Sequence, residues 1–145
     1  MSDGSCTVRL EIQSVIDELD RVQVVTNDIA RRAGLDGDEL DWWELAVREA
    51  VINAIEHGNH NDPEKRVFIE FATTSTADST ELSISIRDQG AGFDPDQVAD
   101  PLAPDNLLKT SGRGVFLMKQ FMDDLTLQRA PGGGMEVRLI KRIPH

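Results

Sequence analysis

The sequence predicts an α+β fold, a two-layer sandwich in which a mixed, mostly antiparallel β-sheet carries its helices on one face. Two long stretches in the first sixty residues have apolar side chains at helical spacing. Two later pairs of stretches alternate apolar and polar residues, as do the strands of hairpins with one buried face. The length of 145 residues suits one ordinary domain, so we expect residues 1–145 to form a single domain.

The N-terminal part is expected to contain one strand and two helices. Residues 7–12 alternate and predict the first strand. Apolar residues then recur every three or four positions over residues 15–33, which predicts a long helix, and Gly34 suits its C-terminal cap. The Asp residues of the turn at 35–38 suit the N-cap of the second helix, which we expect to end at Gly58.

The second helix carries the first candidate chemistry. Its predicted buried stripe consists of Trp43, Ala46, Val47, Ala50, Val51, Ala54 and Ile55. Outside this stripe, Glu49 and Asn53 lie one turn apart on the same face. The helix alone leaves two interpretations open: a solvated polar face, or a carboxylate and an amide held on a rigid element for chemistry.

Strands are also expected in the second half of the chain. Residues 66–72 and 81–87 alternate and predict an antiparallel hairpin, with residues 73–80 as a polar loop between them. Residues 125–128 and 135–140 predict a closing hairpin around a Pro-Gly-Gly-Gly turn. These two hairpins would supply most of the sheet.

The composition excludes several classes of function. A net charge of -11 argues against a nucleic-acid or anionic-membrane surface, because such binding needs clusters of Lys and Arg. The N-terminus lacks the basic and apolar regions of a signal peptide, and no apolar run approaches the roughly 20 residues of a membrane helix. Cys6 is the single cysteine and has no partner for an intrachain disulfide. We therefore expect a cytoplasmic protein whose partners are proteins, with no nucleic acid and no membrane.

The first glycine motif, Asp88-x-Gly90-x-Gly92, leaves the end of a predicted strand. Its glycines let the backbone approach a ligand closely, and an Asp at this place can accept a hydrogen bond from an exocyclic amine such as that of adenine. A dinucleotide-binding loop is excluded because Pro95 stands where a helix would begin and no third glycine follows. A plain turn stays open as the alternative.

The second glycine motif, Ser111-Gly112-Arg113-Gly114, begins a helix predicted over residues 112–122. Free N–H groups at a helix N-terminus bind anions, and Thr110, Ser111 and Arg113 would add donors for phosphate. A glycine-rich hinge is the alternative. Between the two motifs, residues 94–111 are rich in Pro and Asp and are expected to form a long, mobile lid.

Taken together, the helix and the two glycine motifs predict a nucleotide site. The amide of Asn53 is a suitable oxygen ligand for Mg²⁺. The carboxylate of Glu49 is placed to orient or deprotonate a nucleophilic hydroxyl. The glycine motifs would bind the adenine and the phosphates.

The ordered set Glu49-x-x-x-Asn53-Ala54, Asp88-x-Gly90-x-Gly92 and Gly112-Arg113-Gly114 resembles the N, G1 and G2 boxes of the GHKL ATPases, which share the Bergerat ATP-binding fold. More closely, the run Glu-Ala-Val-x-Asn-Ala-x-Glu-His-Gly-Asn and the later Ser-Gly-Arg-Gly-x-Phe-Leu-Met are similar to those of bacterial anti-sigma factor serine/threonine kinases. The resemblance spans nearly the whole chain.

The resemblance implies roles for these residues in binding and transfer. Glu49 would be the general base toward a serine or threonine hydroxyl of a partner, and Asn53 would hold the Mg²⁺ that bridges the ATP phosphates. Asp88 would bind the adenine amino group, with Gly90 and Gly92 shaping that pocket. The remaining residues of the predicted site would lie at the phosphate end, and they are Thr110, Ser111, Gly112, Arg113 and Gly114.

The resemblance also implies partners. The substrate would be a STAS-type anti-anti-sigma protein, the client would be a sigma factor, and the N-terminal region would contribute to a homodimer. Two alternatives stay open: an ATP-gated binding module without transfer, and a kinase of a STAS partner switch whose client is not a sigma factor. Relatives often carry a Thr in the closing hairpin near the adenine, where this chain has Met135 and Glu136.

Overall fold

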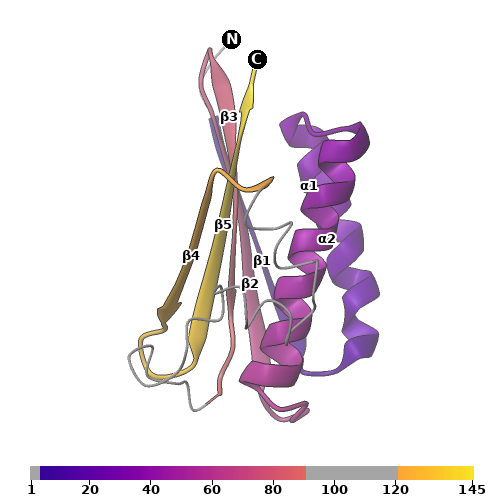
Figure 1. Ribbon diagram of the computed structural model, residues 1–145, viewed down its shortest axis with the longest axis vertical. Coiled ribbons are helices and arrows are strands. Elements are labelled where there is room, and N and C mark those ends of the chain that lie inside the picture. Colours follow the sequence, from indigo (N-terminus) through magenta and orange to yellow (C-terminus); the bar gives the residue numbers. More distant parts are fainter. Residues whose placement is uncertain (1–3, 91–120) are drawn as a thin grey trace.

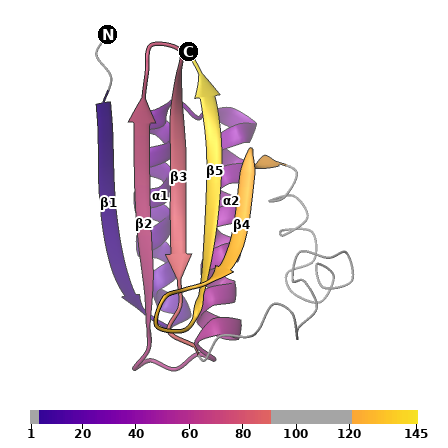
Figure 2. The same ribbon diagram turned by 90° about the vertical axis from the view of Figure 1, so that its left-hand side faces the viewer.

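The computed structural model describes residues 4–90 and 121–145, and these residues form two layers (Figure 1). One layer is a β-sheet, and the other consists of helices α1 (Leu19–Ala33) and α2 (Gly37–Asn53). Both helices cover the same face of the sheet, and Figure 2 shows its other face without a helix in front of it. The two-layer sandwich that the sequence predicts is therefore confirmed.

The sheet has five strands in the order β1-β2-β3-β5-β4, so β1 and β4 are its edges (Figure 2). The strands are β1 (Gly4–Gln13), β2 (Arg66–Ser75), β3 (Ser79–Arg87), β4 (Asp124–Arg129) and β5 (Met135–Pro144). All four pairings are antiparallel, so among the described strands the sheet is antiparallel and not mixed as the sequence predicts. Both hairpins predicted from the alternating sequence are present.

The polar loop expected at residues 73–80 is the clearest error in the predicted elements. Strands β2 and β3 continue through most of it, with Ser75 paired to Thr80, and only residues 76–78 form the turn. Threonine is polar but β-branched, which favours extended structure. The buried Thr80 hydroxyl also makes hydrogen bonds with Ser75 (3.0 Å) and His145 (2.7 Å), so this polar stretch is tied into the sheet.

The helix ends follow the predicted signals in part. Gly34 adopts a left-handed φ of 108° and its N–H reaches the carbonyls of Ala30 and Arg31, so the predicted cap of α1 is confirmed. A short 3-10 turn, η1 (Ile16–Glu18), precedes α1. Asp36 occupies the N-cap position of α2, but its side chain makes no capping hydrogen bond, so that part of the prediction is wrong.

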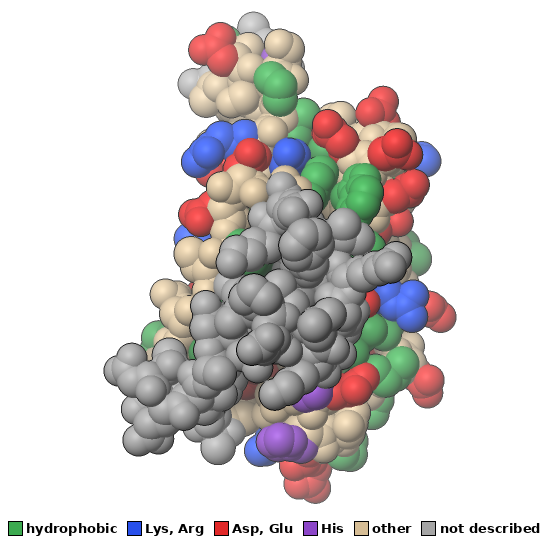
Figure 3. Space-filling model, viewed as in Figure 1, with side chains coloured by type: hydrophobic (Ala, Val, Ile, Leu, Met, Phe, Trp, Pro, Cys, Tyr) green, Lys and Arg blue, Asp and Glu red, His purple; other side chains and the backbone are tan. Residues whose placement is uncertain are grey.

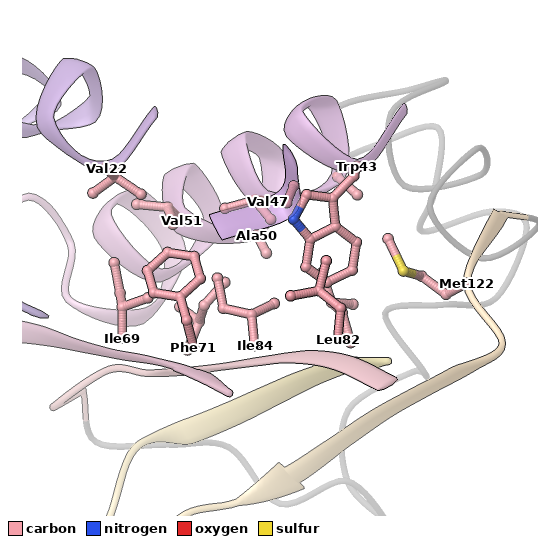
Figure 4. Packing of buried hydrophobic residues seen from close by; sticks show 14 of the residues in the cluster. Val22, Trp43, Val47, Ala50, Val51, Ile69, Phe71, Leu82, Ile84 and Met122 are labelled. Carbon is pink, nitrogen blue, oxygen red and sulfur yellow. The ribbon is translucent and has the colours of Figure 1, made fainter. Parts of the chain in front are cut away.

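The core lies between the sheet and the apolar stripe of α2. Every residue of the predicted stripe is buried. Figure 4 shows Trp43, Val47, Ala50 and Val51 directed from α2 toward Ile69, Phe71, Leu82 and Ile84 on β2 and β3. Full burial of such side chains stabilises by roughly 1.5–3 kcal/mol each. The stripe therefore fixes the rotation of α2 about its axis and with it the direction of the helix's polar residues.

The surface differs between the two layers. Acidic side chains are spread along the helical side, on the right of Figure 3, in line with the net charge of -11. The other face of the sheet mixes both signs, with Arg9 2.8 Å from Glu70 and Arg87 stacked 4.6 Å from the Phe68 ring. A cavity of about 440 Å³ opens beside these groups, away from the helix layer. No helix in the described parts of the chain is long and apolar enough to span a bilayer.

Candidate nucleotide site

Glu49 and Asn53 lie on α2 beside its buried stripe, and both are half-buried. Glu49 Oε2 and Asn53 Oδ1 are themselves buried and have no hydrogen-bond partner among residues 4–90 and 121–145. Buried polar atoms are normally paired, since leaving one unsatisfied costs about 1–3 kcal/mol. Two unpaired oxygen acceptors one turn apart are a feature that stability alone does not explain. They can receive a hydroxyl, an N–H group or a cation.

The helix changes its hydrogen bonding directly after Asn53. Residues Ala54–Gly58 form a π-helical turn, η2, which ends where the sequence predicts the helix to end. The backbone N–H of Asn59 closes this turn on Ala54 O at 2.9 Å, and His60 and Asn61 follow with positive φ of 52° and 58°. Such π turns are frequent at functional sites. This one brings Gly58 against the end of β3.

Asp88 follows the end of β3 and is only 6% exposed. Its Oδ1 accepts hydrogen bonds from two main-chain groups, Gly90 N at 2.9 Å and Met135 N at 3.1 Å. Its own N–H donates to Met135 O at 3.0 Å. The carboxylate is thus fixed by the main chain on one side, while none of the described residues donates to Oδ2. Asp88 therefore presents one oxygen as an acceptor for a ligand's donor.

Three glycines from distant segments enclose Asp88. A Cβ on Gly58 would lie 2.2 Å from Asp88 Oδ2, and a Cβ on Gly134 would lie 2.2 Å from Asp88 O. A Cβ on Gly90 would lie 2.0 Å from the carbonyl oxygen of Gly58. A side chain at Gly90 or Gly134 would collide with backbone atoms, and one at Gly58 would displace the Asp88 side chain. We call Gly58, Gly90 and Gly134 the glycine cage.

A family comparison decides what kind of domain carries this geometry. The model of the family described as the histidine kinase-like ATPase domain matches residues 12–141, which is most of the chain. The chain belongs to the histidine kinase-like ATPase family. The Bergerat-type sandwich expected from the three sequence boxes is the fold of this family, and the resemblance is confirmed.

Two kinds of relative are similar to this ATPase domain over most of its length. It is 32% identical to an anti-sigma F factor of Oceanobacillus iheyensis, over 99% of this chain and 87% of that protein. It is 36% identical over 110 residues to the anti-sigma F factor of Bacillus subtilis, over 73% and 71% of the two chains. It is 25% identical to the serine-protein kinase RsbW of Bacillus subtilis, over 91% and 84%.

A solved structure agrees with the fold. The crystal structure of the RsbU and RsbW domains of Rv1364c from Mycobacterium tuberculosis matches 97% of this chain with a TM-score of 0.63 at 15% identity. The ATPase domain spans 33% of that longer chain. At this identity the likeness concerns the fold alone.

The structure describes part of the predicted site. Glu49 and Asn53 share one face of α2, and Asp88 and Gly90 meet the end of η2 through Gly58. The other predicted residues lie outside the described residues, as do the predicted lid and most of the helix after it. These site residues are Gly92, Thr110, Ser111, Gly112, Arg113 and Gly114.

Sequence reasoning missed four residues at this end of the ATPase domain. The sequence indicates Gly58 as a helix end and Gly134 as part of a turn, but in the structure both glycines lie against Asp88. Met135 holds Asp88 through its backbone N–H, and Asn59 holds the next residue of the loop, Gln89, through its side chain. A local signal existed only for the glycines, because the contacts join segments far apart in the sequence.

Met135 and Glu136, the first two residues of β5, differ in their surroundings. Met135 is buried and contributes its main chain to the anchoring of Asp88. Glu136 instead receives a hydrogen bond from Gln128 at 3.2 Å and lines the cavity on the face of the sheet away from the helices. Of the two, Met135 is thus the residue beside the candidate adenine end.

Proposed function

We propose that the chain is an ATP-dependent serine/threonine protein kinase and anti-sigma factor that phosphorylates a STAS-type anti-anti-sigma protein. The observation that carries the proposal is the pair of buried oxygens, Glu49 Oε2 and Asn53 Oδ1, left without partners among the described residues. Membership of an ATPase family and the relatives named serine-protein kinase and anti-sigma F factor support it.

In this proposal Asp88 and Glu49 act at opposite ends of ATP. Asp88 Oδ2 accepts a hydrogen bond from the adenine amino group, since Oδ1 is already occupied by main-chain donors. Glu49 takes the proton of a partner's serine or threonine hydroxyl. The hydroxyl oxygen then bonds to the γ-phosphorus as the bond from that phosphorus to the bridging oxygen of ADP breaks. Transfer of this kind depends mainly on positioning and charge neutralisation.

Asn53 fits the role of a magnesium ligand. Its Oδ1 is a buried neutral oxygen without a partner in the described parts of the chain, and Mg²⁺ prefers oxygen donors while keeping several waters. No group of three or more His, Cys, Asp or Glu side chains that would hold a metal occurs among the described residues. In this proposal phosphate oxygens and water complete the coordination. Bound Mg²⁺ would neutralise charge on the phosphates.

The phosphate end of the proposed site rests on the sequence. We propose that backbone groups of Gly112 and Gly114 contact the phosphates, with Thr110 and Ser111 as further donors. Arg113 would face the γ-phosphate or the partner protein. Gly92 would complete the adenine pocket.

The anti-sigma role follows from the relatives. The proteins that are 32% and 36% identical to this chain are named anti-sigma F factors, so we propose a sigma factor as the client. A sigma-factor client would place the protein in the cytoplasm. Phosphorylation of the STAS partner would switch which of the two proteins the kinase holds.

A transfer assay with radiolabelled ATP and STAS proteins of the same organism tests the proposal. Glu49→Gln keeps the size of the side chain but removes the base, so we expect transfer to fall by roughly a hundredfold or more. The affinity for ATP, measured by calorimetry, should stay within about threefold because Glu49 is not at the adenine end. The label should resist acid, as phosphoserine and phosphothreonine do and phosphohistidine does not.

Glu56→Gln is the matched control. It makes the same chemical change at an exposed glutamate seven residues further along the same helical segment, and it should transfer like the wild type. Transfer by Glu49→Gln at the wild-type rate would remove Glu49 from the role of base. ATP-dependent complex formation with no labelled product in any STAS protein would favour the ATP-gated binding module instead.

A further inference from the structure

We propose that Asn59 is a positioning residue that sets the base-binding loop, residues 88–90, relative to the end of the catalytic helix. This role rests on the proposed function, because it concerns how Asp88 discriminates between the nucleobases of ATP and other nucleotides. Asn59 follows η2 directly, and its side chain is completely buried at 0% exposure. A fully buried amide in a loop needs partners for its donors and for its acceptor.

Both ends of the Asn59 amide are satisfied by different parts of the fold. Nδ2 donates to Ser14 Oγ at 2.7 Å and to Arg66 O at 2.9 Å. Oδ1 accepts a hydrogen bond from the backbone N–H of Gln89 at 2.7 Å. The Nδ2 end is thus fixed to the scaffold and the Oδ1 end is fixed to the loop. These opposite polarities also determine which way the amide is turned.

The scaffold end is rigid. Ser14 is itself fully buried after β1, and its hydroxyl donates to Lys65 O at 2.7 Å just before β2 begins. Asn59 therefore holds the loop against two strands that pair with each other along their length. A displacement of Asn59 would have to break hydrogen bonds to both segments.

The loop end lies at the residue between Asp88 and Gly90. Gly90 N donates to Asp88 Oδ1, which closes the loop on itself, and the backbone of Met135 holds Asp88 at the start of the loop. Asn59 Oδ1 holds the middle of the loop at Gln89 N, and the Gln89 side chain adds a second contact there, since its Oε1 accepts from Arg66 N at 2.6 Å. Of these two, only the Asn59 contact is made by a fully buried side chain, because Gln89 is exposed.

Asn59 also connects the loop to the helix. Its backbone N–H bonds to Ala54 O in η2, and the preceding residue, Gly58, is the one whose carbonyl oxygen packs against Gly90. One residue thus joins the helix that carries Glu49 to the loop that carries Asp88. The distance between the base-binding end and the transfer end of the site depends on this connection. Loss of the amide should therefore weaken the discrimination between adenine and guanine before it affects the general base, Glu49, or the magnesium ligand, Asn53.

The test compares Asn59→Ala with Ser14→Ala. Asn59→Ala removes the contact to Gln89, whereas Ser14→Ala removes one partner of Nδ2 and leaves the contact to Gln89 in place. Two quantities are measured: hydrogen exchange of the Gln89 amide by NMR without nucleotide, and the ratio of ATP to GTP affinity by calorimetry. A thermal melt of each variant records any general loss of stability.

For Asn59→Ala we expect exchange of the Gln89 amide to accelerate and the ATP-to-GTP ratio to fall about tenfold, as loss of one buried hydrogen bond allows. For Ser14→Ala we expect both quantities to stay within about twofold of the wild type, even where the melting temperature falls. Asn59→Ser, polar but too short to reach Gln89, should behave like Asn59→Ala and serves if the alanine variant does not fold.

Two results would overturn the role of Asn59. One is an unchanged ATP-to-GTP ratio in both short variants with a lowered melting temperature, which would make Asn59 a stabilising residue only. The other is an equal loss of the ratio in Ser14→Ala. Wild-type protein that binds neither ATP nor GTP would refute the proposed function and this role together, so the two failures are distinguishable.

Discussion

Gly134→Ala tests whether the glycine cage fixes Asp88. Gly134 has a φ of +78°, and a Cβ there would lie 2.2 Å from Asp88 O and 3.0 Å from Asp88 Oδ1. Gly132 lies two residues earlier in the same turn with a φ of +84°, and nothing lies within 4 Å of a Cβ built on it. The two alanine variants thus share the backbone strain, and only one of them meets Asp88.

The two variants should differ in their free energy of unfolding only through the contact of the new methyl group with Asp88. A left-handed conformation costs an alanine roughly 1–2 kcal/mol, so Gly132→Ala should lower the free energy of unfolding by about that amount. Gly134→Ala must also move the turn away from Asp88 until the 2.2 Å contact exceeds about 3.0 Å. Such a shift disrupts the two hydrogen bonds between Asp88 and Met135, at 3.0 and 3.1 Å, which contribute about 1 kcal/mol each. The total for Gly134→Ala is therefore about 3–4 kcal/mol.

Urea unfolding and calorimetric titration with ATP measure both consequences. We expect Gly132→Ala to bind ATP like the wild type, and Gly134→Ala to bind it at least tenfold more weakly at temperatures where it is folded, because its Asp88 carboxylate is no longer anchored. Equal losses of stability in the two variants would refute the steric argument. Normal ATP binding by a destabilised Gly134→Ala would refute the proposal that the glycine cage positions Asp88 for binding adenine.

Two further predictions concern the recognition of adenine by Asp88 and the predicted lid. In Asp88→Asn the side-chain oxygen must keep accepting from Gly90 N and Met135 N, so the amide nitrogen replaces Oδ2 and presents a donor. Calorimetry should then show ATP binding weakened about a hundredfold and the preference moved toward 6-oxo purines such as GTP and ITP; unchanged ATP affinity would contradict this orientation. The sequence also predicts that residues 94–111 become protected from hydrogen exchange when Mg-ATP is added, and equal exchange in both states would argue against a closing lid.

The sequence predicts those features that depend on local periodicity. The stripe from Trp43 to Ile55 predicts the buried face of α2 because burial against a sheet selects residues at helical spacing, and all seven are buried. The alternation in β2 and β3 predicts which side chains face the helices for the same reason. The stretch 73–80 fails because its polarity indicates a loop while its threonines pair across the hairpin.

The contacts around Asp88 fall outside such rules. Gly58, Gly90 and Gly134 come from a helix end, a strand exit and a hairpin turn, and each is explained locally by its own turn. They meet around Asp88 only because the sheet order places β5 beside β3. Asn59 is similar, because its partners Ser14 and Gln89 are 45 and 30 residues away. Patterns of neighbouring residues therefore cannot predict these contacts, because each contact joins segments that are far apart in the sequence.

Met135 anchors Asp88 with its main chain alone. Position 135 acts on Asp88 through its N–H and its carbonyl, which any residue except proline provides. The buried Met side chain can then pack against its surroundings without changing those two bonds. The anchoring of Asp88 therefore depends on the register of β5 against β3 and on the glycine beside it, and not on the side chain at position 135.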